Sequence, residues 1–144
     1  FETWQVNEFQ NDAITPSIAG AQADPNNDGI LNLTKYAHGI SPRSLSCEGL
    51  PVVTVNPANA VITYTRDQAA TDLVYSIQKR TGDDWVALSS VVEQYVPLPG
   101  DATRPWVNPI QVIASIPRST DTSGTDKDPL PATIYRLLVS FKTP

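Results

Sequence analysis

After its first third, the chain carries apolar residues in short runs separated by polar and turn-forming residues. The runs are rich in β-branched and aromatic side chains, which fit the pleated surface of a strand. In one run Leu73, Tyr75 and Ile77 point to one face and Ser76 and Gln78 to the other, as in an antiparallel strand buried on one side. We predict strands at residues 52–55, 61–65, 74–79, 85–88, 91–96, 110–116 and 134–141. The pattern is typical of a mainly β fold, an antiparallel two-sheet β-sandwich of the fibronectin III or jelly-roll kind.

The segments between and within these strands refine the prediction. Residues 134–141 are apolar on both faces, which predicts a central strand. Residues 81–84 have the composition of a hairpin turn. Residues 97–109 hold four prolines and predict a stiff, ordered loop, whereas the polar run at 117–131 predicts a mobile one.

The N-terminal third has a helical period instead. Phe1, Trp4 and Phe9 are spaced as the buried side of an amphipathic helix over residues 1–10. A second helical pattern follows at Leu33 to Ala37, and Gly39 is placed to end it. We therefore expect a helix–loop–helix segment at residues 1–45, packed on a sandwich at 46–144 to form one compact module.

The loop between these helices has the spacing of a calcium-binding loop. Oxygen-bearing side chains stand at its relative positions 1, 3, 5 and 9, and Gly29 stands at position 6. Calcium requires six to eight oxygen ligands, and a glycine permits the sharp bend that brings alternate residues inward. The predicted Ca²⁺ ligands are Asp24, Asn26, Asp28, the backbone carbonyl of Ile30, and Asn32, directly or through water. Such an ion would tie two short helices to the sandwich.

Position 12 of this loop departs from the pattern. A bidentate glutamate is expected there, and the chain has Lys35. The alternative is a turn without metal, in which Asp24 and Asn26 bind their own backbone.

Composition and charge narrow the function. The chain has 144 residues, enough for one domain, and a net charge of −5 with only ten scattered Lys and Arg, which argues against nucleic acid as a partner. It contains no methionine and begins with Phe1, so we expect a processed or excised piece of a longer polypeptide. No apolar stretch is long enough for a transmembrane segment. Cys47 is the only cysteine and is expected to be a small buried apolar residue.

Enzymatic chemistry is poorly supported. His38 is the only histidine, it lacks the signature of a nucleophile or zinc site, and a place at a helix C-terminus accounts for it. Asp67 and Asp72 have the residue type of a glycosidase acid and base, but a sandwich of this size rarely has the deep cleft required. We therefore predict that the chain is not an enzyme.

Carbohydrate binding is the better hypothesis. Sugars stack their apolar faces on aromatic rings beside amides and carboxylates. Trp106, in the proline-rich loop, is the best candidate for a platform, and Tyr95 is the second. The predicted carbohydrate-binding residues are Trp106, Tyr95, Arg104, Asn108 and Glu93. The alternative for Trp106 is a lid over the core.

The sequence also resembles a known kind of module. Residues 23–33, followed by Tyr36-Ala37 and Gly39-Ile40-Ser41-Pro42, are similar to a signature that introduces C-terminal modules of large secreted proteins of Verrucomicrobia and Planctomycetes. The loop in this signature resembles dockerin-like and thrombospondin type 3-like calcium loops. The chain departs from the signature in having Lys35 for Glu, His38 for Leu and Ser41 for Asp.

The resemblance implies a calcium loop packed on a β-sandwich, in a non-catalytic accessory module of a secreted or cell-surface bacterial protein. We expect the module to bind a polysaccharide or cell-surface glycan on behalf of its parent multidomain polypeptide. The alternative is a structural, sorting or surface-assembly module that acts through protein–protein contacts.

Overall fold

The computed structural model of the chain describes residues 1–56, 58–117 and 134–143. The helical elements are α1 (Glu2–Phe9), the 3₁₀ helix η1 (Gln10–Ile14), α2 (Pro16–Ala19) and α3 (Asn32–Ala37). The strands are β1 (Val52–Val55), β2 (Asn59–Asp67), β3 (Leu73–Thr81), β4 (Asp84–Ala87), β5 (Val92–Pro97), β6 (Pro109–Pro117) and β7 (Tyr135–Phe141). The predicted polar loop at 117–131 lies, but for Pro117, outside the described residues.

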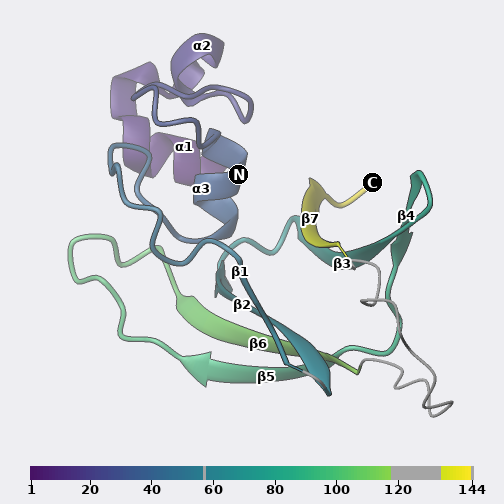
Figure 1. The fold of residues 1–144 in the computed structure, drawn as a ribbon. Coiled ribbons are helices and arrows are strands. Elements are labelled where there is room, and N and C mark those ends of the chain that lie inside the picture. The colour runs from purple at the N-terminus through teal and green to yellow at the C-terminus, as the bar shows by residue number, and fades with distance from the viewer. Residues whose placement is uncertain (57, 118–133, 144) are drawn as a thin grey trace, which may run out of the picture.

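The strands form two antiparallel sheets, and the helices gather at one end of them (Figure 1). One sheet has the order β1-β2-β6-β5, and the other has the order β4-β3-β7. The prediction of a mainly β fold with two antiparallel sheets after a short helical segment is confirmed. No helix in the described ranges is long and apolar enough to cross a membrane.

The core of the sandwich follows from the alternation along β2 and β6. Alternate residues are buried along β6 and over residues 60–64 of β2, and at two places the register pairs a large side chain with a small one. Ile62 lies opposite Ala114, and Ala60 opposite Ile116. Ile77 of β3 joins the same cluster, so the two sheets share one apolar core. Interlocking of large and small residues fills the space between sheets without strain.

The β3–β4 connection is the predicted hairpin turn. Thr81 pairs with Asp84, and Gly82 between them has φ of +63°. A two-residue hairpin turn of this kind requires the left-handed region, which glycine adopts without a steric penalty.

Two expectations about single elements were wrong. Strand β7 lies at the edge of its sheet among the described strands, and Leu138 on its outer side is 39% exposed. The run is rich in apolar residues because it packs on two clusters along its length, not because both faces of the strand are buried. Leu137 packs on the sandwich core, and Val139 packs on the apolar cluster of the helical segment. Cys47 is exposed, because the segment that leads into β1 runs over the surface.

The helical segment has its own apolar cluster, formed mainly by aromatic residues. Trp4 and Phe9 of α1 are buried as predicted, and the Trp4 ring lies 5.6 Å from the ring of Tyr36 on α3. Ala70 and Leu73 from the sandwich complete the cluster. The elements η1 and α2 were not predicted.

Candidate functional site

The loop at residues 24–32 is closed by its own hydrogen bonds. The two carboxylate oxygens of Asp24 accept hydrogen bonds from the backbone N–H groups of Asp28 and Gly29, at 3.2 and 2.8 Å. Asp28 Oδ1 accepts one from Ile30 N at 2.9 Å. Gly29 has φ of +81°, as the tight turn requires. These contacts are those of an Asx-rich turn.

The ammonium group of Lys35 lies among the oxygens of this loop. Its Nζ is 2.7 Å from Asp28 Oδ2, 2.9 Å from Asn26 Oδ1, and 3.2 Å from each of the carbonyls of Pro42 and Ser44. The Lys35 side chain is fully buried. The hydrogen bond from Lys35 lowers the pKa of Asp28, and the Ile30 N–H adds to this effect against the opposing effect of burial.

Only two of the five predicted calcium ligands meet at this point. Asn26 and Asp28 bind the ammonium, whereas the Asn32 side chain turns away and donates to the carbonyls of Ile18 and Gly20 at 2.8 and 3.0 Å. In the described part of the chain, no group of three or more His, Cys, Asp or Glu side chains is placed to hold a metal ion. As arranged here, the donor set fits calcium poorly, because a cation already lies between the oxygens. Calcium binding stays a prediction from the sequence.

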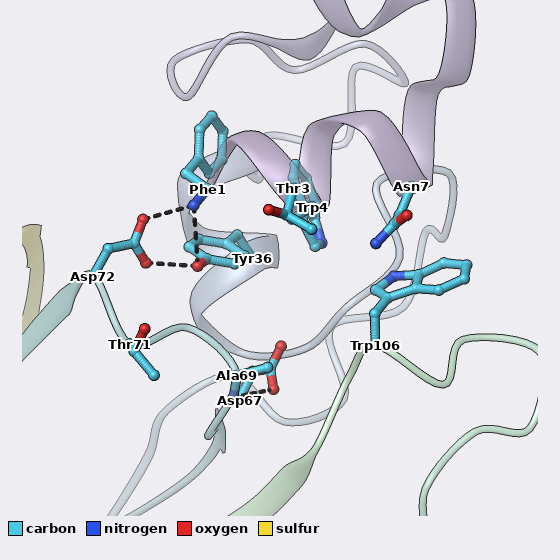
Figure 2. A pocket seen from close by; sticks show the side chains of 10 residues that line it. All are labelled: Phe1, Thr3, Trp4, Asn7, Tyr36, Asp67, Ala69, Thr71, Asp72 and Trp106. Carbon is cyan, nitrogen blue, oxygen red and sulfur yellow. Dashed lines mark hydrogen bonds and ion pairs between the residues drawn. The ribbon is translucent and has the colours of Figure 1, made fainter.

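A pocket of about 230 Å³ lies where α1 meets the sandwich (Figure 2). Helix α1 and the residue before it contribute one wall, the β2–β3 connection contributes the floor and the opposite wall, and Trp106 closes one side. The lining residues are Phe1, Thr3, Trp4, Asn7, Tyr36, Asp67, Ala69, Thr71, Asp72 and Trp106. The pocket therefore combines aromatic rings with carboxylates, hydroxyls and one amide.

The indole ring of Trp106 is held by a nearly buried ion pair between Glu8 and Arg104. Its indole N–H donates to Glu8 Oε1 at 3.1 Å, and Arg104 binds the same oxygen through Nε at 2.7 Å and Nη2 at 2.5 Å. Arg104 also donates from Nη1 to the carbonyl of Gly39 at 2.8 Å. Both charged side chains are nearly buried, with 13% of Arg104 and 6% of Glu8 exposed. The half-buried Trp106 ring is thus fixed between the helical segment and the sandwich.

The two carboxylates of the pocket are both bound within the protein. Asp67 Oδ1 accepts from the backbone N–H groups of Ala69 and Asn108, each at 2.9 Å, and burial raises the pKa of Asp67 despite these bonds. Asp72 accepts from Phe1 N at 2.7 Å and from the Tyr36 hydroxyl at 2.5 Å. Burial and this carboxylate together raise the pKa of Tyr36, whose hydroxyl is the donor in this contact.

The pocket also has a buried donor without a partner. The indole nitrogen of Trp4 is buried and has no hydrogen-bond partner among the residues described. In Figure 2 this nitrogen lies at the end of the ring nearer to Asp67 and Trp106. An unpaired buried donor is costly, so a ligand or ordered water that reached it would add stability.

The predicted carbohydrate-binding residues fall into two places. Tyr95 and Glu93 lie on β5, where the Tyr95 hydroxyl donates to Glu93, and Tyr95 is 54% exposed. Tyr95 lines a second, more open pocket with Arg66 and Pro97, of about 450 Å³. Asn108 is exposed beside Val107. Trp106 and Arg104 belong to the first pocket or its support, so the five residues do not form one platform.

His38 ends α3 and is buried. Its Nδ1 lies 2.6 Å from the Thr65 carbonyl, and because that oxygen can only accept, Nδ1 carries the proton. Burial lowers the pKa of His38, with the Thr65 carbonyl acting in the opposite direction. The ring is therefore a neutral link between α3 and β2.

Glu8 was not predicted as part of a site. It lies 98 residues from Trp106 in the sequence, and no local motif connects them.

The comparisons with known proteins found no match to this chain among family models, curated proteins or solved structures.

Proposed function

We propose that this chain is a non-catalytic carbohydrate-binding module, the accessory part of a secreted bacterial protein, and that its ligand binds against Trp106 in the pocket below α1. The observation that carries the proposal is an aromatic ring fixed by a buried ion pair at the side of a pocket lined by hydroxyls, an amide and two carboxylates. This is the combination of groups that a sugar requires.

Each part of the pocket matches a part of a sugar ring. The apolar C–H face stacks on the indole of Trp106, and the hydroxyl groups bind Asn7, Thr3 and the carboxylates of Asp67 or Asp72. Because Glu8 and Arg104 hold the indole before any ligand arrives, little side-chain entropy is lost on binding. The Tyr36 hydroxyl is already committed to Asp72, so it orients that carboxylate instead of binding ligand.

The size of the pocket indicates which part of a glycan it holds. At about 230 Å³ it is smaller than the roughly 300 Å³ at which pockets for drug-sized ligands begin. We infer a single sugar residue or a chain end, in contrast to the long flat surface that a crystalline polysaccharide would need.

A glycan array followed by calorimetry tests the proposal. Trp106→Ala is expected to weaken binding at least about tenfold, equivalent to about 1.4 kcal/mol. Trp85→Ala is the matched control, because Trp85 packs under Arg136 at 4.2 Å, away from the pocket, and its loss should leave affinity unchanged.

Three results would contradict the proposal. They are silence across the array from a folded chain, equal losses in the two tryptophan variants, and release of new reducing ends from a bound oligosaccharide, since the last is the product of a hydrolase. Circular dichroism of each variant checks that the fold is retained.

A second candidate function is a structural or assembly role through protein contacts, and β1 supports it. This strand ends its sheet among the described strands, and Val52, Val53 and Val55 are 62%, 45% and 54% exposed. An exposed apolar edge strand is a template for pairing with another chain. Light scattering after size exclusion should then show association that rises with concentration and is lost in Val53→Lys, and a monomer at all concentrations would count against self-assembly.

A further inference from the structure

The calcium-type loop differs from its pattern by a reversal of charge at position 12. The pattern has an anionic ligand there, and this chain has a cation, Lys35, whose side chain is 0% exposed. We propose that the Lys35 ammonium is the permanent cation of this loop, in the place where related loops hold calcium, and that the fold forms without metal. This inference is independent of the carbohydrate proposal.

The geometry around Nζ is that of a cation site built from oxygens. Four oxygens lie within 2.7 to 3.2 Å of Nζ, two from side chains of the loop and two from backbone carbonyls of the segment at 42–44. Calcium–oxygen distances are about 2.3 to 2.6 Å. The cage is therefore wider than a calcium site and has the spacing of N–H···O hydrogen bonds to an ammonium.

The charges in the cage agree with one positive charge and not with two. Asp28 is the one formal anion in contact with Nζ, and its second oxygen is bound by Ile30 N. Asp24, the other carboxylate of the loop, accepts two backbone N–H groups. The ammonium and Asp28 neutralise each other, whereas a dication would have to displace a buried lysine and would be left with unbalanced charge.

The position of Lys35 explains what the cation does. Its backbone belongs to α3, which has only six residues and no side-chain cap. Its Nζ joins α3 to the loop at Asn26 and Asp28 and to the chain that leads toward β1 at Pro42 and Ser44. A bound calcium ion would link its ligands in the same way, but here the link is covalently attached to the helix and cannot be removed by a chelator.

The test compares melting temperatures in calcium and in chelator for the wild type and two variants. The wild type is expected to melt at the same temperature in both buffers and to give no heat on titration with CaCl₂. Lys35→Glu restores the acidic ligand and removes the cation, so it should melt far below the wild type in chelator and recover in calcium by mass action. Lys35→Met is the control, because it fills the space without charge or ligand and should lower both melting temperatures equally.

Two outcomes would overturn the proposal. The first is stoichiometric calcium binding by the wild type with a rise in its melting temperature, which would mean that the metal and not Lys35 is the loop's cation. The second is a folded Lys35→Glu variant that melts identically in the two buffers, which would mean that the oxygens around Nζ are no cation site. If Lys35→Glu does not fold, the wild-type titration decides alone, with silence supporting the proposal and binding refuting it.

Discussion

The sandwich and the helical segment are stabilised by different means. In the sandwich, long strands bury alternate apolar side chains, and the buried residues of β2 and β6 are almost all apolar. The helical segment consists of elements of eight, five, four and six residues, and it buries Lys35, Asn32 and most of Glu8. Helices this short are marginal in water on their own.

The difference shows how short elements can hold a defined position. An apolar contact is non-directional, so a small apolar cluster alone would leave the helices free to slide. A buried hydrogen-bonded charge accepts one arrangement, because any other leaves it unpaired at high cost. The helical segment is therefore fixed by polar contacts that are specific and sensitive to charge, whereas the apolar core of the sandwich should be insensitive to charge. The following variants test this contrast.

The largest effect is expected in the sandwich core. Ile62 is 0% exposed and faces Ala114 across β2 and β6, so Ile62→Ala leaves a cavity that the neighbouring strand cannot fill. We expect a loss of about 4 kcal/mol in the free energy of unfolding. Denaturant melts at two salt concentrations measure it.

Measurements at two salt concentrations test whether the sandwich core depends on charge. The loss caused by Ile62→Ala should be the same at low and at high salt, because no charge is involved. A loss that depended strongly on salt would show that the sandwich also relies on electrostatics, and the contrast between the two regions would fail.

A somewhat smaller effect is expected at the junction of the two regions. Arg104→Met removes the cation beside Glu8, whose side chain is 6% exposed, and leaves a buried carboxylate unpaired. The expected loss is about 3 kcal/mol. Because Glu8 also positions the Trp106 indole, sugar binding should weaken in the same variant.

The second variant of this cycle is Glu8→Gln combined with Arg104→Met. With no charge left to bury, the double variant should be more stable than Arg104→Met alone, and the glutamine oxygen can still accept from Trp106. Glu8→Gln alone is measured as well. If the double variant is less stable than the wild type by the sum of the losses in the two single variants, the ion pair contributes nothing as a pair, and packing of the arginine stem is what matters.

The same difference between the sandwich and the helical segment determines which features could be predicted from the sequence. Period-two alternation placed all seven strands described here to within two residues at each end, and the spacing of Trp4 and Phe9 placed α1, because both patterns depend on neighbours in sequence. The order of the strands within each sheet was harder to predict. The apolar run at β7 indicated a central strand, yet it lies at an edge because its residues pack on two clusters along its length.

The site was harder to predict, for a physical reason. Trp106 and Arg104 were identified by type, but the residue that holds them together, Glu8 on α1, lies 96 residues before Arg104. Lys35 was noticed only as a missing ligand. Its role depends on the carbonyls of Pro42 and Ser44, and backbone carbonyls leave no trace in a sequence pattern.

The smallest effect we predict is a pH dependence from His38, the only histidine of the chain. Burial lowers its pKa in the folded protein below the ordinary value of 6.5, so the unfolded chain binds the proton more readily. The stability that neutral His38 contributes is thus present above about pH 6.5 and is lost as the pH falls below it. Asp67, whose pKa burial raises, acts in the opposite direction at lower pH, so the pH dependence of the wild-type stability alone is not decisive.

The comparison is with His38→Gln, which keeps a donor for the Thr65 carbonyl but does not titrate. Between pH 7 and pH 5 the wild type should lose more stability than the variant, as urea melts would show, and parallel curves would mean that His38 can be protonated in place without cost to the junction of α3 and β2.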